Sequence, residues 1–221
     1  MAIAFNSISV KQFYAVNKKV VTLAGSTIVS VITITLFWSL YWHPLRESEA
    51  AAKLAPLHHY FEKDSFYVVL KGIKGKKMMT APEIADSYFL TDKSNEAAMM
   101  AGIAYMQTGK FEKAISYLEQ AEPKDQFLSA GILSARAHCY SELGKPDKAA
   151  DLYAEAGSKS SSEFSAQYWK NAGIHYEKAE SYSKALDCYE KIKNEYSSAA
   201  EASDIDKYIS KVKALQGDFN P

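Results

Sequence analysis

Apolar residues follow two different patterns along this chain. Near the start they form one continuous run, since residues 20–42 contain no charged side chain. Further on they recur at spacings of three and four, which is the period of a helix with one buried face. The first pattern predicts a membrane-spanning helix, because 23 helical residues at about 1.5 Å each reach across a hydrocarbon core of about 30 Å.

The end of the apolar run favours a retained membrane span over a cleaved signal peptide. Trp38, Tyr41 and Trp42 stand there, and aromatic rings favour the interface between lipid and water. A signal peptide has a shorter apolar run, and the small residues at 50–52 lie too far downstream for a cleavage site. Threonine and serine side chains within the run are expected to bond back to carbonyls of their own helix. His43-Pro44 predicts the end of the helix, because proline has no amide hydrogen.

The second pattern is a framework of small and aromatic residues that returns 35 and then 36 residues further on. Self-similarity at such a period is typical of a solenoid of helical hairpins. We therefore predict an all-α protein in which three stacked hairpins over residues 95–198 share a core. The framework positions are Gly102, Tyr105, Gly109, Phe111, Ala114 and Ala121; then Ala137, Tyr140, Gly144, Pro146, Ala149 and Ala156; then Gly173, Tyr176, Glu180, Tyr182, Ala185 and Ile192.

Each copy of the framework has the parts of a helical hairpin. A small residue three before a tyrosine, as in Gly102 and Tyr105, lies on the same helix face and lets a neighbouring helix come close. Four residues after the tyrosine, Gly109 and Gly144 are expected to end the first helix, because glycine readily adopts the left-handed conformation. A second amphipathic helix follows in each copy.

The segment before the repeats, residues 43–94, is expected to form a helical preface that covers the first repeat. Its apolar stripe predicts a helix over 45–70 with a break near Asp64. A second helix is expected to start at Thr80 or Ala81, ahead of Pro82, since proline favours the first turn.

Two polar segments complete the plan. The loop at 71–77 holds two glycines and four lysines, which predicts either a solvated turn or a contact with acidic lipid headgroups. Residues 156–163 read as a polar turn between the second and third repeats. Residues 199–216 read as a capping helix with a polar outer face, and residues 217–221 as a frayed tail.

Charge is unevenly distributed. The first 42 residues hold three lysines and no acid, while the remaining 179 hold 23 basic and 26 acidic residues. An acidic soluble part argues against nucleic acid as a partner. Lys11, Lys18 and Lys19 precede the span, against Arg46 and Lys53 after it. Because basic residues favour the cytoplasmic side, we expect the N-terminal tail (1–19) in the cytoplasm and the repeats outside, which in a bacterium is the periplasm.

The residue types used in catalysis and metal binding are few and poorly placed. His58 and His59 point about 100° apart on a helix, so the pair is not expected to chelate a metal. Cys139 and Cys188 read as buried thiols, with a disulfide left open for an oxidising compartment. Cys139 directly follows His138, so the two do not face each other. No phosphate loop or catalytic grouping accompanies them, and we expect no enzyme, no cofactor and no catalytic or metal site.

The first helices of stacked hairpins line a concave surface, and exposed Met and Ile there suit varied polypeptide segments. The alternative is that the preceding hairpin buries these positions. The predicted protein-binding groove consists of Met99, Ile103 and Met106 in the first repeat, Ser134, His138 and Ser141 in the second, and Lys170, Ile174 and Glu177 in the third.

The threefold framework resembles the tetratricopeptide repeat, which also often has a tryptophan where Trp169 stands, four residues before Gly173. The sequence departs from that pattern at Glu180, where a turn glycine is usual, and at Pro146, where an aromatic residue is usual. A proline that often ends a repeat is absent after the third copy. We therefore expect a looser second hairpin within the same fold.

Four further segments carry a second resemblance: residues 60–66, 101–105, 190–196 and 205–209. With the order of anchor, preface, repeats and cap, they resemble the YfgM-type family, the tetratricopeptide-like ancillary subunits of the bacterial SecYEG translocon, in its Bacteroidetes-type variant. That resemblance implies an inner-membrane accessory at the translocon exit, whose soluble part meets emerging chains or periplasmic chaperones. The alternative function is a structural scaffold in another envelope assembly or secretion machine.

Overall fold

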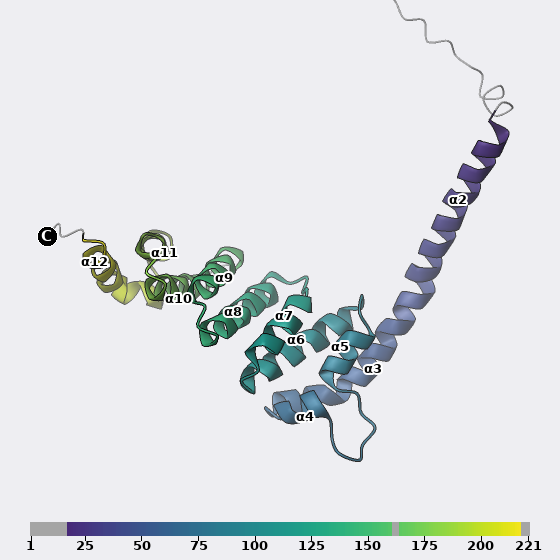
Figure 1. Cartoon of the computed structure of the whole chain (residues 1–221), viewed down its shortest axis with the longest axis horizontal. Helices are drawn as coiled ribbons and strands as arrows, with labels where there is room; N and C mark the ends of the chain where they lie inside the picture. The colour runs from purple at the N-terminus through teal and green to yellow at the C-terminus, as the bar shows by residue number, and fades with distance from the viewer. Residues whose placement is uncertain (1–16, 161–163, 218–221) are drawn as a thin grey trace, which may run out of the picture. The chain divides into compact units, whose positions relative to one another are not determined.

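The computed structural model describes residues 17–160 and 164–217. Outside this part lie Lys11 with most of the expected cytoplasmic tail, residues 161–163 and the last four residues. Of the polar turn expected over 156–163, residues 156–159 are instead the end of a helix. Every regular element within it is helical, as predicted (Figure 1). The chain divides into two compact units, Met1–Ser48 and Glu49–Pro221, which are described separately.

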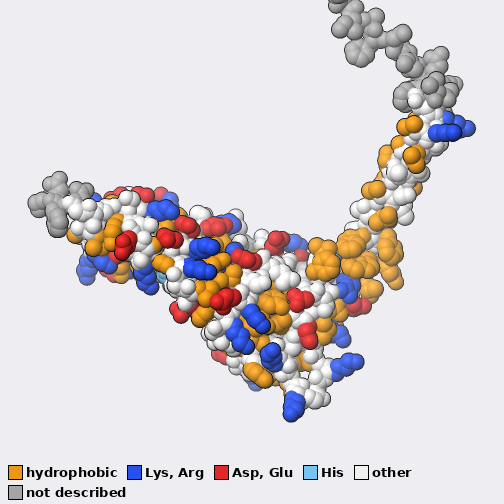
Figure 2. All heavy atoms as spheres, in the orientation of Figure 1, with side chains coloured by type: hydrophobic (Ala, Val, Ile, Leu, Met, Phe, Trp, Pro, Cys, Tyr) orange, Lys and Arg blue, Asp and Glu red, His pale blue; other side chains and the backbone are white. Residues whose placement is uncertain are grey.

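The first unit holds the apolar helix α2 (Lys18–Phe37) and a π-helical turn, η1 (Trp38–Trp42). The helix that begins with α2 is the candidate membrane span. Among the described residues it is the one helix with the length and apolar composition to cross a bilayer. None of the residues of α2 is buried within the protein, and Figure 2 shows apolar side chains along its length. Its hydroxyls bond back as predicted: Thr33 and Thr35, for example, each donate to the carbonyl four residues earlier at 2.8 Å.

The backbone does not break at His43-Pro44, contrary to the prediction. Helix α3 (His43–Glu62) begins there directly after the π turn. The amide of His43 donates to the carbonyl of Trp38, five residues back. The hydrogen bonds have therefore already changed from the α-helical to the π-helical pattern before Pro44, which has no amide hydrogen to donate. Proline is tolerated in a first helical turn. The π turn also stacks the rings of Trp38 and Trp42, with centroids 4.2 Å apart.

The second unit begins within α3, which buries Leu54 and Leu57. The predicted break follows: Asp64 has a positive φ of 53°, and α4 (Phe66–Lys71) starts just after it. The loop of exposed lysines leads to α5 (Ala81–Ser87). Thr80 begins α5 with a capping box: its amide donates to Glu83 Oε2 at 2.8 Å and its hydroxyl accepts from the Glu83 amide at 3.4 Å. Helices α4 and α5 pack against α6.

Three helical hairpins follow, as the repeated framework predicts. In each, the first helix packs on the second, and each second helix also packs on the first helix of the next hairpin. The pairs are α6 (Asp92–Gln107) with α7 (Phe111–Gln120), α8 (Gln126–Glu142) with α9 (Pro146–Lys159), and α10 (Ser165–Lys178) with α11 (Tyr182–Glu195).

The small framework residues are sites of close helix approach. A Cβ atom added at Gly102 would lie 2.6 Å from Leu118 Cγ, and one at Gly173 would lie 2.4 Å from Tyr189 Cε1. Both partners come from the second helix of the same hairpin and are buried. The small residues therefore set the spacing between the two helices of these hairpins.

The three hairpin turns share one backbone geometry despite their different sequences. Gly109, Gly144 and Glu180 all have positive φ, at 73°, 69° and 58°. In each turn this residue donates to the carbonyl three before it at 3.0 Å, and the next residue donates to the carbonyl five before it at 2.9 Å. This is the double hydrogen bond of a Schellman motif. Glu180 therefore takes a conformation that glycine adopts without strain.

The second hairpin is not loosened at its turn by Pro146. Its turn has the same hydrogen-bond lengths as the other two, and Pro146 is the first residue of α9. Proline suits that position because the first amide of a helix has no intrahelical acceptor. The aromatic residue expected there is thus replaced without a change in the turn.

The C-terminal segment is a 3₁₀ turn, η2 (Ala200–Asp204), followed by α12 (Ile205–Leu215), rather than one continuous helix. Ile205, Ile209 and Val212 are buried and belong to the same core cluster as α10 and α11. A separate cluster joins α3, α4 and α5 to the first hairpin. The repeats are thus covered by packed helices at both ends.

Candidate functional site

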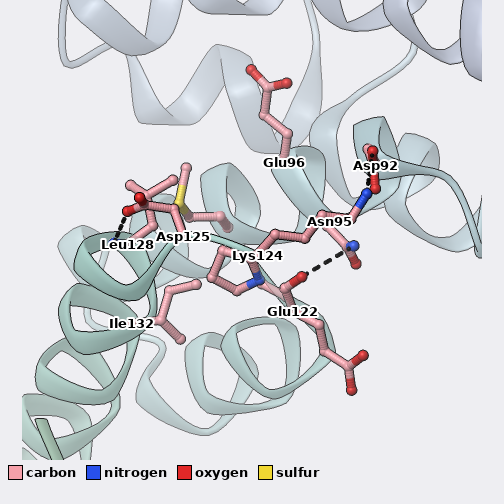
Figure 3. A pocket seen from close by; sticks show the side chains of 11 residues that line it. Asp92, Asn95, Glu96, Glu122, Lys124, Asp125, Leu128 and Ile132 are labelled. Atoms are coloured by element: carbon pink, nitrogen blue, oxygen red, sulfur yellow. Dashed lines mark hydrogen bonds and ion pairs between the residues drawn. The ribbon is translucent and has the colours of Figure 1, made fainter. Parts of the chain in front are cut away.

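An apolar groove runs between α6 and α8, the first helices of the first two hairpins. It encloses about 190 Å³. Beside it lies a larger hollow of about 350 Å³, which we call the acidic hollow (Figure 3). The two share Met99, Leu128 and Ile132. The apolar groove is also lined by Ile103, Leu118, Phe127, Gly131 and Ala135, and the acidic hollow by Asp92, Asn95, Glu96, Ala121, Glu122, Pro123, Lys124 and Asp125.

The start of α8 brings large apolar side chains to the edge of the groove. Asp125 caps this helix, since its carboxylate accepts from the amide of Leu128 at 2.9 Å. The cap places Phe127 and Leu128 in the first turn, where 57% and 42% of their surface is exposed. The ring of Phe127 also meets that of Phe164 edge-on, with centroids 5.4 Å apart. Three large apolar side chains, those of Phe127, Leu128 and Phe164, are thus exposed at this edge.

Two polar contacts cross the mouth of the acidic hollow. Lys124 Nζ, from the connection between α7 and α8, reaches Asp92 Oδ2 at 2.9 Å (Figure 3). Asn95 Nδ2 donates to the carbonyl of Glu122 at 3.4 Å. The Lys124 and Asp92 side chains are 84% and 63% exposed, and an exposed ion pair contributes only about 0–1 kcal/mol. The mouth can therefore open at little cost.

Glu96 joins the hollow to the preface. Its Oε1 lies 2.6 Å from His58 Nε2 on α3, and its Oε2 accepts from Lys93 Nζ at 2.6 Å. Partial burial would raise the pKa of Glu96, but the hydrogen bonds and positive charges of Lys93 and His58 outweigh it and lower the pKa. Glu96 is therefore ionised near neutral pH.

The structure brings two of the nine predicted groove residues, Met99 and Ile103, into the apolar groove. Met106 lines neither the groove nor the hollow and, like Met99 and Ile103, packs against the N-terminal core. In the second repeat, Ser134 is half-buried. His138 is exposed and packs edge-on against Phe111, with ring centroids 6.4 Å apart.

Ser141 and two of the predicted residues of the third repeat, Lys170 and Glu177, have polar partners within the protein. Ser141 Oγ lies 2.9 Å from His175 Nε2 on α10. Lys170 Nζ reaches Asp204 Oδ1 at 2.8 Å, and Glu177 accepts a hydrogen bond from Tyr189 and pairs with Lys211 on α12.

Ile174 lines a further hollow of about 450 Å³ beside Tyr208 and Lys211. Several polar positions of the predicted groove thus hold helices together, while apolar Met99 and Ile103 line an open cleft.

The large apolar residues of this surface that the sequence analysis did not identify include Phe127, Leu128 and Ile132, together with Phe164, whose ring meets that of Phe127. The available signal was the adjacent pair Phe127-Leu128 in the first turn of a helix, two and three residues after its capping aspartate. The pair lies nine and ten residues before Ala137, outside the spacing used to choose the groove.

The two cysteines are free and buried. Burial raises the pKa of the Cys139 thiol to about 11 and that of Cys188 to about 12, which suppresses the nucleophilic thiolate. His58 is engaged with Glu96, and His59 packs against Tyr60. Within residues 17–160 and 164–217 there is no group of three potential metal ligands.

Comparison with known proteins supports one class. A family model for the tetratricopeptide repeat matches residues 98–127, which cover most of α6, all of α7 and the start of α8. No curated protein matches the chain. The match and the repeated hairpins together indicate a tetratricopeptide repeat protein. Such repeats generally mediate binding to other proteins and are typically interaction scaffolds rather than enzymes.

Proposed function

We propose that this protein is a membrane-anchored interaction module whose apolar groove binds segments of partner proteins. The observation that carries the proposal is the open cleft between α6 and α8, where Phe127 and Leu128 remain exposed on a repeat scaffold. When a partner covers exposed apolar residues beside an apolar cleft, the free energy of the complex is lowered by about 25 cal/mol for each Å² of apolar surface removed from water. Residues 95–198 are proposed as the repeats, 43–94 as the preface and 199–216 as the cap.

The proposed membrane placement follows from α2. Lys18 and Lys19 are the first two residues of this helix and precede the uncharged run at 20–42, which favours a cytoplasmic N-terminus and periplasmic repeats. Protease access in sealed cells and in spheroplasts tests this orientation. Digestion of the repeats only after the outer membrane is opened supports it, and protection of the repeats in spheroplasts rejects it.

The finer proposal is an accessory of the SecYEG translocon that meets newly translocated chains or periplasmic chaperones. Its support is the resemblance of the anchor, preface, repeats and cap to the YfgM-type family. Tethering beside a translocation pore would raise the local concentration of emerging segments, so modest affinity would suffice. Co-purification of the full chain in mild detergent with translocon components supports this role, and their absence argues against it.

The binding function itself is tested with an unfolded model client. The full chain, in nanodiscs of zwitterionic lipid, is titrated into fluorescently labelled, reduced and carboxymethylated α-lactalbumin, and anisotropy is recorded. Phe127→Ser is expected to weaken binding about tenfold, since removal of a central aromatic contact typically costs about 1–2 kcal/mol.

Phe89→Ser is the matched control, because Phe89 is 58% exposed, against 57% for Phe127, but lines neither the apolar groove nor the acidic hollow. Equal binding by both variants and the parent chain would reject the groove as the binding site. Unchanged client binding together with loss of a stable envelope partner would instead favour the structural scaffold.

A further inference from the structure

We infer that the acidic hollow selects partner segments in which an apolar anchor is flanked by lysine or arginine. This inference rests on the proposed function, because it specifies the chemistry of the segment that the groove binds. The first observation is the arrangement of apolar and charged residues. Met99, Leu128 and Ile132 form an apolar floor shared with the groove, while carboxylates stand around the mouth.

The charges around the hollow are unbalanced. Four acidic residues, Asp92, Glu96, Glu122 and Asp125, line it together with one basic residue, Lys124. Lys124 forms an ion pair with Asp92. The carboxylate of Glu96 is hydrogen-bonded to Lys93 and His58, which lie beside the hollow.

Glu122 and Asp125 form no ion pair with any described residue. Asp125 uses its carboxylate to cap α8, and a capping carboxylate keeps its negative charge. The unbalanced charge therefore lies in the connection between α7 and α8, at the edge of the apolar floor.

This geometry suits a cationic side chain next to an apolar one. An anchor that enters the floor brings its neighbours in the chain to the mouth, where they meet Glu122 and Asp125. A lysine or arginine there is attracted, and a glutamate is repelled by the same carboxylates. The exposed ion pair between Lys124 and Asp92 is also replaceable, because an incoming cation can take the place of Lys124 at Asp92.

The test uses three labelled peptides with the same central Leu-Phe-Ala-Leu core, flanked on both sides by lysine, glutamine or glutamate. Binding to the full chain in phosphatidylcholine nanodiscs is measured by anisotropy, with empty nanodiscs subtracted. Each exposed charge pair contributes a factor of about 1.5 to 5, so the lysine peptide is expected to bind about tenfold more tightly than the glutamate peptide. This ratio is expected to shrink as salt is added.

The double variant Glu122→Gln/Asp125→Asn is expected to reduce that ratio to about threefold or less. Asparagine is as good a helix cap as aspartate, so α8 keeps its start. The matched control Glu112→Gln/Asp187→Asn removes two exposed carboxylates that do not line the hollow, and it is expected to leave the ratio unchanged.

Equal affinities for the three peptides, with all three weakened by Phe127→Ser, would overturn the charge selection and leave the binding groove intact. An unchanged ratio in the Glu122/Asp125 variant would also overturn it. Binding of none of the peptides would reject the inference and the proposed apolar groove together.

Discussion

Replacing Gly173 by alanine tests whether the small framework residues set the spacing of the hairpins. The new Cβ would lie 2.4 Å from Cε1 and 2.7 Å from Cζ of Tyr189, which is fully buried. Ordinary contacts begin near 3.4 Å, so α10 and α11 must separate by about 1 Å or the ring must turn. Turning the ring would stretch the 2.6 Å hydrogen bond from Tyr189 to Glu177.

The expected cost combines two unfavourable terms with one favourable term. Overpacking of this kind costs about 1–3 kcal/mol, and weakening a hydrogen bond to a carboxylate adds about 1.5–3 kcal/mol. Alanine in place of glycine within a helix returns about 1 kcal/mol. We therefore expect Gly173→Ala to lower the free energy of unfolding by about 2–4 kcal/mol, measured by urea denaturation of the full chain in neutral detergent and followed by circular dichroism.

Gly131→Ala provides the matched control. Gly131 also lies within a helix of the repeats, but nothing stands within 4 Å of a Cβ added there. This variant is expected to gain up to about 1 kcal/mol from helix propensity alone. If Gly173→Ala is as stable as Gly131→Ala, the close approach of α10 and α11 does not depend on the small residue, and the reasoning is wrong.

Three further predictions follow from particular contacts. Glu180→Gly should raise the free energy of unfolding by about 0.5–1 kcal/mol in the same urea assay, because relief of a left-handed residue exceeds the entropy cost of glycine; a loss of stability would contradict this. The pKa of Glu96 is lowered in the folded protein from an unfolded value near 4.5. Ionised Glu96 therefore stabilises the fold at pH values above 4.5, and this stabilisation is lost as pH falls through the folded pKa. Glu96→Gln should therefore flatten the stability decline between about pH 5 and 3, and an unaltered slope would argue against the ion pairs. Cys139 and Cys188 should resist iodoacetamide at pH 8 until urea unfolds the chain, whereas rapid labelling of the native protein would show that they are accessible.

The repeated framework was predictable because it is periodic and each member has a local physical role. The spacing of Gly102 and Gly173 from their tyrosines indicated the close helix contacts that the structure contains. The π turn before Pro44 was not predictable in this way. A proline in the sequence shows that one backbone donor is missing. Whether the helix ends there or continues through a π-helical turn depends on the neighbouring residues.

The candidate site was predictable only in part. Met99 and Ile103 were identified from helical phase, and both line the apolar groove. Helical phase does not reveal what later segments cover: Glu177 is engaged by Tyr189 and by Lys211 of α12. Phe127 was missed because it precedes the framework positions of its repeat. Its exposure depends on where α8 begins and on whether neighbouring segments cover its ring.

The most direct test of the central claim is photo-crosslinking in living cells with benzoylphenylalanine at position 127 or, as control, at position 89. The two native side chains are almost equally exposed, so a general stickiness of the surface would label both positions alike. Binding in the apolar groove predicts crosslinks to other polypeptides from position 127 and few or none from position 89. Equal crosslinking from the two positions, or none from position 127, would contradict the proposed role of the groove.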